Sequence, residues 1–99
     1  MYETVQHDKC NAQFQKIGNV GICSLEINNI NSHVDAKVIL PINLVPNWFR
    51  AKNAVGFVMV SIDGGNNIAE CTFSGTGIAV WGTLPSASGQ FVVFLNDHN

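Results

Sequence analysis

Residues that form turns interrupt the apolar stretches of this chain at short intervals. Nine glycines and three prolines are spread over 99 residues, and asparagine often stands near them. The apolar residues between these breaks are largely valine, isoleucine, phenylalanine and tryptophan, which favour strands. No stretch has the apolar spacing of a convincing amphipathic helix. The sequence therefore predicts an all-β fold.

Short strands can be placed between the breaks, in an order typical of an antiparallel sandwich or barrel. In the second strand the apolar residues move from even positions to odd ones, and a β-bulge near Cys23 and Ser24 would explain this change. We expect a small antiparallel β-barrel or sandwich of about six to seven strands. The predicted strands are residues 13–17, 20–30, 36–40, 54–62, 68–74, 78–84 and 90–95, with turns or loops at 18–19, 28–32, 42–53, 63–67, 74–77 and 85–89.

The strand at residues 54–62 is apolar on both faces. It suits the centre of the fold, either between two sheets or beneath another subunit. In a trimer, part of the strand around Phe57 and Met59 would be buried between protomers. The preceding segment contains Pro46, which discourages a regular strand ladder, so we expect an ordered loop there. Trp48 in this loop is expected to close the end of the barrel or to lie at a subunit contact.

The chain carries few charges. Only 12% of the residues are charged, and the net charge is −2, so no positive surface is expected to bind nucleic acid. A chain of 99 residues forms one domain, and a small domain with few charges favours oligomerisation. No apolar run approaches the length of about 18 residues that spans a membrane, so we expect no membrane insertion. The first ten residues lack the features of an export signal.

The three cysteines, Cys10, Cys23 and Cys71, form no C-x-x-C pair and exclude a dense disulfide framework. Free, buried thiols are the favoured interpretation, although one bridge between Cys10 and Cys23 stays open if they lie on paired strands. The histidines His7 and His33 are far from each other and from His98. We therefore expect no metal site and no cofactor.

Sequence signals for catalysis are weak. Ser74 lies in S-G-T-G, which lacks the nucleophile elbow of serine hydrolases, and no phosphate-binding glycine loop occurs. We expect a protein that is not an enzyme. A saccharide-cleaving enzyme that uses Glu70 and Asp63 as its two carboxylates remains an alternative.

The residues point more clearly to saccharide binding. Sugar sites often combine an aromatic platform with short polar side chains, and Trp81 follows a turn that contains glycine. Glu70 and Thr72 share one face of the antiparallel partner strand by period-two alternation. The alternative is that Trp81 belongs to the core. The candidate saccharide-binding residues are Trp81, Glu70, Thr72, Asn66, Asp63, His33 and Asp35.

Several motifs occur in an order that is similar to one known family. They are L-V-P-N-W-F-R-A-K-N at residues 44–53, the apolar strand, the Gly64-Gly65 turn, S-G-T-G at 74–77 and Trp81-Gly82, with K-I-G-N-V at 16–20 fitting more loosely. Over residues 14–95 the chain resembles the head domain of lactococcal phage receptor-binding proteins of the lower baseplate type. The resemblance is carried mostly by the V-P-N-x-F motif and by the spacing from the double glycine to the tryptophan.

The resemblance implies a small β-barrel head that assembles as a homotrimer at the tip of a phage tail baseplate in the virion. It implies adsorption to the host through cell-wall polysaccharide. Residues 1–99 would form a single receptor-binding head domain without the shoulder and neck regions, through which such heads join other baseplate proteins.

The chain departs from the family pattern at one place. Relatives carry a His-x-Asp pair on the strand after the double glycine, where this chain has Glu70-Cys71-Thr72. Trp81 matches, and the carboxylate and hydroxyl can still bind sugar hydroxyls. The alternative function is a structural β-barrel module of a baseplate or capsid type, without a ligand and with Trp81 in its core.

Overall fold

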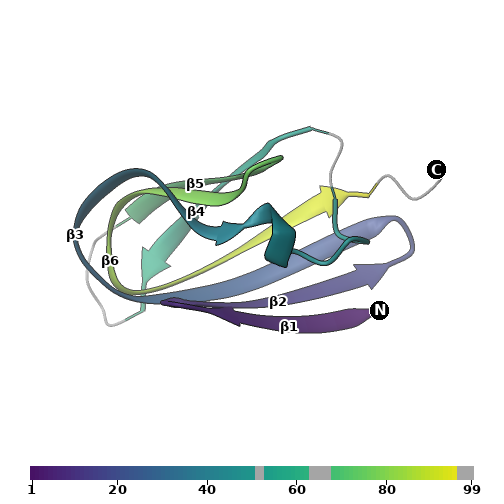
Figure 1. Cartoon of the computed structure of the whole chain (residues 1–99), viewed down its shortest axis with the longest axis horizontal. Helices are drawn as coiled ribbons and strands as arrows, with labels where there is room; N and C mark the ends of the chain where they lie inside the picture. The colour runs from purple at the N-terminus through teal and green to yellow at the C-terminus, as the bar shows by residue number, and fades with distance from the viewer. Residues whose placement is uncertain (51–52, 63–67, 96–99) are drawn as a thin grey trace.

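The fold is all-β and antiparallel, as predicted. The computed structural model describes residues 1–50, 53–62 and 68–95. Within these residues the chain forms six strands and one short 3₁₀ helix, and no α-helix (Figure 1). The elements are β1 (Tyr2–His7), β2 (Cys10–Ile17), β3 (Val20–Pro41), η1 (Ile42–Leu44), β4 (Val55–Ser61), β5 (Ile68–Ser74) and β6 (Gly77–Phe94).

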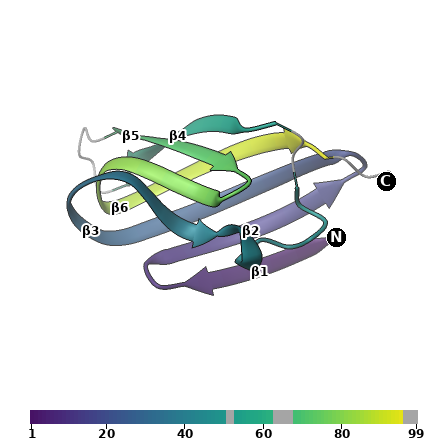
Figure 2. The same cartoon turned by 45° about the horizontal axis from the view of Figure 1, so that its top comes forward.

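The long strands β3 and β6 organise the sheet. They pair antiparallel and bend together, so that they run through both sides of the molecule (Figure 2). The sheet order is β1-β2-β3-β6-β4-β5, and β6 also pairs with β5. Residues 87–89 of β6 pair with β4, whereas residues 77–81 pair with β5, which itself pairs with β4. These strands therefore close on themselves, as in a small barrel.

The predicted loops at residues 28–32 and 85–89 are wrong, because both segments lie inside continuous strands. The ladder continues through the pairs Asn28–Ser86 and Ile30–Leu84 on either side of Pro85. Register shifts follow after Ile30, and Asn29 and Ala36 have positive φ angles of 66° and 52°. Asparagine and proline thus mark a bend in a paired ladder here, and four predicted strands become two.

The predicted β-bulge near Cys23 and Ser24 is also wrong. The β2–β3 register runs without a shift from Val20 to Ile27. Odd positions of this stretch face the core, beginning with the buried Gly21, while the outward positions Val20 and Ile22 are apolar as well. The apparent change of phase came from apolar residues on both faces, together with a glycine at an inward position.

β1 was not predicted, because its residues show little alternation of apolar and polar types. It forms the edge of the sheet and pairs only with β2 among the described strands, and most of its side chains are exposed.

The strand at residues 54–62 was expected to be buried on both faces. In the single chain, only one of its faces is buried. Met59 is buried on β4, whereas Val58 and Val60 are 52% and 46% exposed.

The core is built around Phe49, which is fully buried although it lies outside the strands. Its ring centroid lies 4.8 Å from that of Phe14, 5.6 Å from Phe73 and 6.1 Å from Phe91. Trp48 packs edge-on against Phe49 and is half-buried. The loop after η1 therefore supplies the central side chain of the core, and Phe49 fills the barrel more deeply than Trp48.

Arg50 holds this loop in place. Its Nη2 donates hydrogen bonds to the carbonyl oxygens of Ile42 at 3.3 Å and Val45 at 3.2 Å, and to Oδ1 of Asn47 at 3.3 Å. The carbonyl oxygen of Ile42 also accepts a hydrogen bond from the backbone N–H of Val45, at 3.1 Å. The guanidinium has several donors and therefore links the backbone of η1 to the loop that follows it. The ordered loop predicted for residues 42–53 is present over its described part, with η1 at its start.

Candidate saccharide-binding site

The β-sheet register brings Trp81, Glu70 and Thr72 together. Glu70 on β5 pairs with Trp81 on β6 and with Val58 on β4, which gives the row Val58–Glu70–Trp81 across three strands. The next row consists of Gly56, Thr72 and Ala79. The intervening residues Cys71 and Val80 are buried, so these rows lie on the outer face.

The two rows surround a hollow of about 470 Å³. Gly56 leaves space there, because a Cβ atom at this position would meet only the backbone oxygen of Cys71, at 3.9 Å. Glu70 is exposed and Thr72 is half-buried. The residues that line the hollow are Gly56, Phe57, Val58, Glu70, Cys71, Thr72 and Trp81.

Trp81 is half-buried and lies outside the buried hydrophobic cluster. Trp81 is therefore not one of the buried core residues. Over the part of the chain that the structure describes, the side chains of Glu70 and Thr72 make no hydrogen bond with other protein groups. An indole, a carboxylate and a hydroxyl therefore line one hollow, with polar atoms open to a ligand.

His33 and Asp35 lie on β3, away from the wall of this hollow. His33 Nε2 is 3.0 Å from Asp35 Oδ1, and the two side chains are 64% and 78% exposed. The β3–β6 register places Asp35 between the pairs Val34–Gly82 and Lys37–Val80. This part of β3 therefore runs beside Trp81 on the side opposite β5. Asp63 and Asn66 lie outside the described residues.

The three cysteines are free and buried. Cys10 lies opposite Ile27, and Cys23 lies opposite Phe14, so the two residues are on paired strands but not opposite each other. Burial raises the pKa of the Cys10 thiol to about 11 and that of Cys71 to about 12. Burial, with a smaller effect of the nearby Cys10, also raises the pKa of Cys23. The thiols are therefore protonated at neutral pH and poor nucleophiles.

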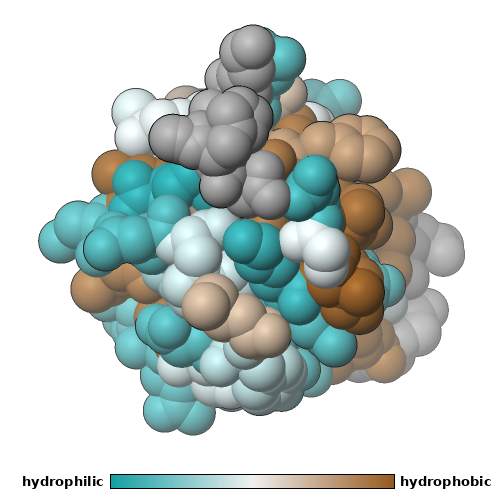
Figure 3. Space-filling model, turned by 90° about the vertical axis from the view of Figure 1, so that its right-hand side faces the viewer, coloured by the Kyte–Doolittle hydropathy of each residue, from teal (hydrophilic) through white to brown (hydrophobic). Residues whose placement is uncertain are grey.

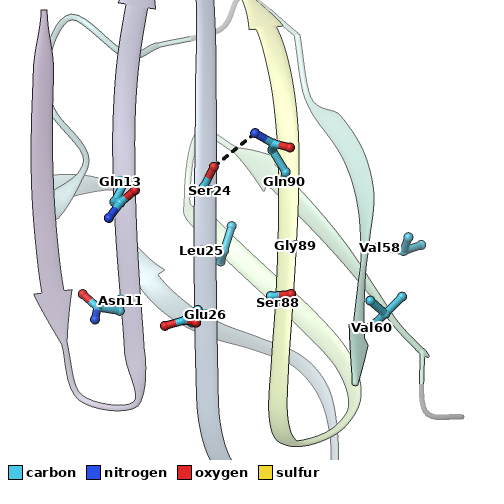
Figure 4. Close-up of a pocket in the computed structure, with 10 residues that line it drawn as sticks. All are labelled: Asn11, Gln13, Ser24, Leu25, Glu26, Val58, Val60, Ser88, Gly89 and Gln90. Atoms are coloured by element: carbon cyan, nitrogen blue, oxygen red, sulfur yellow. Dashed lines mark hydrogen bonds between the residues drawn. The ribbon is translucent and has the colours of Figure 1, made fainter. Parts of the chain in front are cut away.

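Another hollow, of about 630 Å³, lies on the outer face of β2, β3, β6 and β4 (Figure 4). Sequence reasoning did not identify it. The signal was present as alternating polar residues in three strands, but β6 is distant in the sequence from the consecutive strands β2 and β3. Its lining residues are Asn11, Gln13, Ser24, Leu25, Glu26, Val58, Val60, Ser88, Gly89 and Gln90.

Within residues 1–50, 53–62 and 68–95, no group of three or more His, Cys, Asp or Glu side chains is placed to hold a metal ion. The same residues contain no helix that is long and apolar enough to cross a membrane. Comparison with protein-family models finds no match, and comparison with curated proteins finds none either.

Proposed function

We propose that this chain is the receptor-binding head of a phage baseplate protein and recognises a host cell-wall saccharide through Trp81, Glu70 and Thr72. The observation that supports this most is the row Val58–Glu70–Trp81 beside Thr72. The partly exposed indole offers a flat surface for the C–H face of a sugar ring. The carboxylate accepts hydrogen bonds from sugar hydroxyls, and the threonine hydroxyl donates and accepts them.

The openness of the hollow and the low charge of the chain fit this function. A shallow site that makes a few contacts binds a single sugar weakly. Heads that are repeated on one particle bind with an avidity far above that of one contact, because later contacts are intramolecular. The resemblance to lactococcal phage heads supports the same function and the location at the tip of the tail.

A homotrimer is part of this proposal, but it needs a different surface from the one expected around Phe57 and Met59. Met59 is buried, and the partly buried Phe57 packs against the core, with its ring stacked on Phe91 at a centroid distance of 4.4 Å. Exposed apolar side chains gather in two places. One comprises Val58, Val60 and Ile68 on β4 and β5, where Val58 borders the proposed saccharide site. The other lies where β2, β3 and β6 meet. Ile17, Val92 and Phe94 are 59%, 52% and 80% exposed, and Val20 pairs with Phe94.

Figure 3 looks onto this end of the molecule and shows hydrophobic surface concentrated along one side. Contiguous exposed apolar surface of this kind is typical of contacts between proteins. A small domain with few charges cannot cover all its apolar side chains by itself, and contact between copies of the chain would remove this surface from water. We therefore assign the contact between protomers to the end that carries Phe94.

Titration calorimetry with a panel of Gram-positive cell-wall polysaccharides tests the function. The native chain should bind at least one of them saturably, and Trp81→Ala should abolish this binding. Tyr2→Ala is the matched control, because Tyr2 is an exposed aromatic residue on the edge strand β1. It should bind like the native chain.

Two outcomes would oppose the proposal. A folded Trp81→Ala protein that binds as tightly as the native chain would exclude Trp81 as the platform. A native chain that binds no member of the panel would favour the structural β-barrel module instead. Circular dichroism and thermal unfolding of each protein would separate lost binding from lost structure.

A further inference from the structure

The hollow on the outer face of β2, β3, β6 and β4 is organised in two rows across the sheet. One row consists of Gln13, Ser24 and Gln90, which are consecutive partners in the register. The second row consists of Asn11, Glu26, Ser88 and Val60. Figure 4 shows the polar members of both rows on one face, with Val58 and Val60 at one side.

The polar groups of this hollow are almost all neutral. They comprise three carboxamides, two hydroxyls and the single carboxylate of Glu26, and no lysine or arginine lines the hollow. Carboxamides and hydroxyls both donate and accept hydrogen bonds, as sugar hydroxyls do. The composition of the hollow therefore matches a ligand with many hydroxyl groups and no charge.

One hydrogen bond fixes part of this surface, and the remaining polar groups are available. Gln90 Nε2 donates to Ser24 Oγ at 3.2 Å, which orients the carboxamide (Figure 4). Across the described residues, the side chains of Asn11, Gln13, Glu26 and Ser88 make no hydrogen bond with the protein. A ligand can therefore use these groups without breaking protein contacts.

The same features disfavour other ligands. A phosphate group would face Glu26 and find no cationic side chain, and a metal ion would find one carboxylate only. Val58 and Val60 give the hollow an apolar side of limited size, which suits the C–H face of a sugar ring better than a protein interface.

We propose that this hollow is a second saccharide-binding subsite, specific for neutral sugars, that is separate from the one at Trp81. Val58 borders both hollows. An oligosaccharide that crosses β4 beside Val58 would therefore reach both subsites. That extension rests on the function proposed for Trp81, whereas the second subsite by itself does not.

The experiment is a nuclear magnetic resonance titration of the ¹⁵N-labelled chain with glucose, galactose, rhamnose and N-acetylglucosamine. The side-chain NH₂ signals of Asn11, Gln13 and Gln90 report on the hollow directly. At least one sugar should shift these signals saturably, and the shifts should persist in Trp81→Ala. Persistence in that variant separates this subsite from the function proposed for Trp81.

Gln13→Ala and Gln90→Ala should each weaken the binding by about tenfold, because each removes a hydrogen-bonding carboxamide. Gln15→Ala is the matched control: Gln15 lies two residues further along β2 on the same face and does not line the hollow. It should leave the affinity unchanged. Absence of a saturable shift with all four sugars would overturn the proposal, as would equal weakening by Gln15→Ala.

Discussion

Glu70 and Trp81 lie directly opposite each other on β5 and β6. Because this pair belongs to the backbone ladder, the position of the carboxylate beside the indole is set by register and does not depend on a flexible loop. Val58 and Thr72 complete the same outer surface from β4 and β5. Substitutions at this face should therefore alter the hollow without altering the core.

Filling the hollow from Gly56 should block ligand binding and preserve the fold. A Cβ atom at Gly56 has an ordinary contact distance of 3.9 Å to its nearest neighbour, and valine favours strands. We expect Gly56→Val to weaken polysaccharide binding by about tenfold or more and Gly56→Ala to weaken it less. Calorimetry measures both, with Gly75→Ala as control, because no atom lies within 4 Å of a Cβ at Gly75. Unchanged affinity in Gly56→Val would contradict the site.

Removal of Trp81 should cost much less stability than removal of Phe49. Phe49 is fully buried among other rings, so Phe49→Ala should lower the free energy of unfolding by about 3–5 kcal/mol. Trp81→Ala should cost less than about half of this, because Trp81 lies outside the buried cluster. Urea unfolding compares the two proteins. A similar loss of unfolding free energy in both variants would show that Trp81 stabilises the fold as a core residue does.

Gly21 and Phe49 should show energetic coupling. A Cβ atom at Gly21 would lie 2.7 Å from Cε2 of Phe49 and 3.0 Å from Cγ2 of Val93. Gly21→Ala should therefore destabilise the protein by about 1–3 kcal/mol through overpacking. In Gly21→Ala/Phe49→Leu the combined loss should be smaller than the sum of the two single losses. A double-mutant cycle from urea unfolding measures this, and strict additivity would contradict the contact.

The stability of the fold should fall at alkaline pH. The unfolded thiols of Cys10 and Cys71 titrate near 9.0, and burial raises their pKa values in the folded state to about 11 and about 12. The folded state therefore binds more protons above pH 9. The stability that these thiols contribute is complete below pH 9 and is lost as the pH rises through the folded pKa values.

Urea unfolding at pH 8 and pH 10.5 measures this loss. Other groups, such as tyrosine and lysine side chains, also lose protons in this range and can change stability. The variant Cys10→Ala/Cys71→Ala keeps those groups and lacks the two thiols, so it serves as the control. The decrease in stability between the two pH values should be larger for the native chain than for the variant. Equal decreases would show that burial of Cys10 and Cys71 is not responsible.

The assignment of the protomer contact predicts the effect of a charge at Phe94. Light scattering of the native chain at micromolar concentration should give the mass of a trimer. Phe94→Glu should give monomers, because a charge buried at an apolar contact is costly. Val38→Glu is the control, since Val38 is exposed on the other half of β3. A native monomer would exclude the trimer, and a trimeric Phe94→Glu protein would exclude this surface.

The sequence by itself determined the fold class and the local pattern of β5. Alternation over Ile68–Ser74 places Cys71 and Phe73 inward and Glu70 and Thr72 outward, and a short turn leads into β6. These features follow from the period of two along a strand and from the turn residues next to it. The neighbourhood of Glu70, Thr72 and Trp81 could therefore be predicted from local rules.

Only the tertiary structure decided the length of β3 and β6, the exposure of Trp81 and the rows of the second hollow. A proline and two asparagines look like loop signals, but pairing between distant segments carries the ladder through Asn28–Ser86 and Ile30–Leu84. Tryptophan suits a core and a binding surface equally well, so its burial depends on what packs over it. Asn11 and Ser88 share a hollow because β3 and β6 bring the two ends of the chain side by side, and no local pattern encodes such pairing.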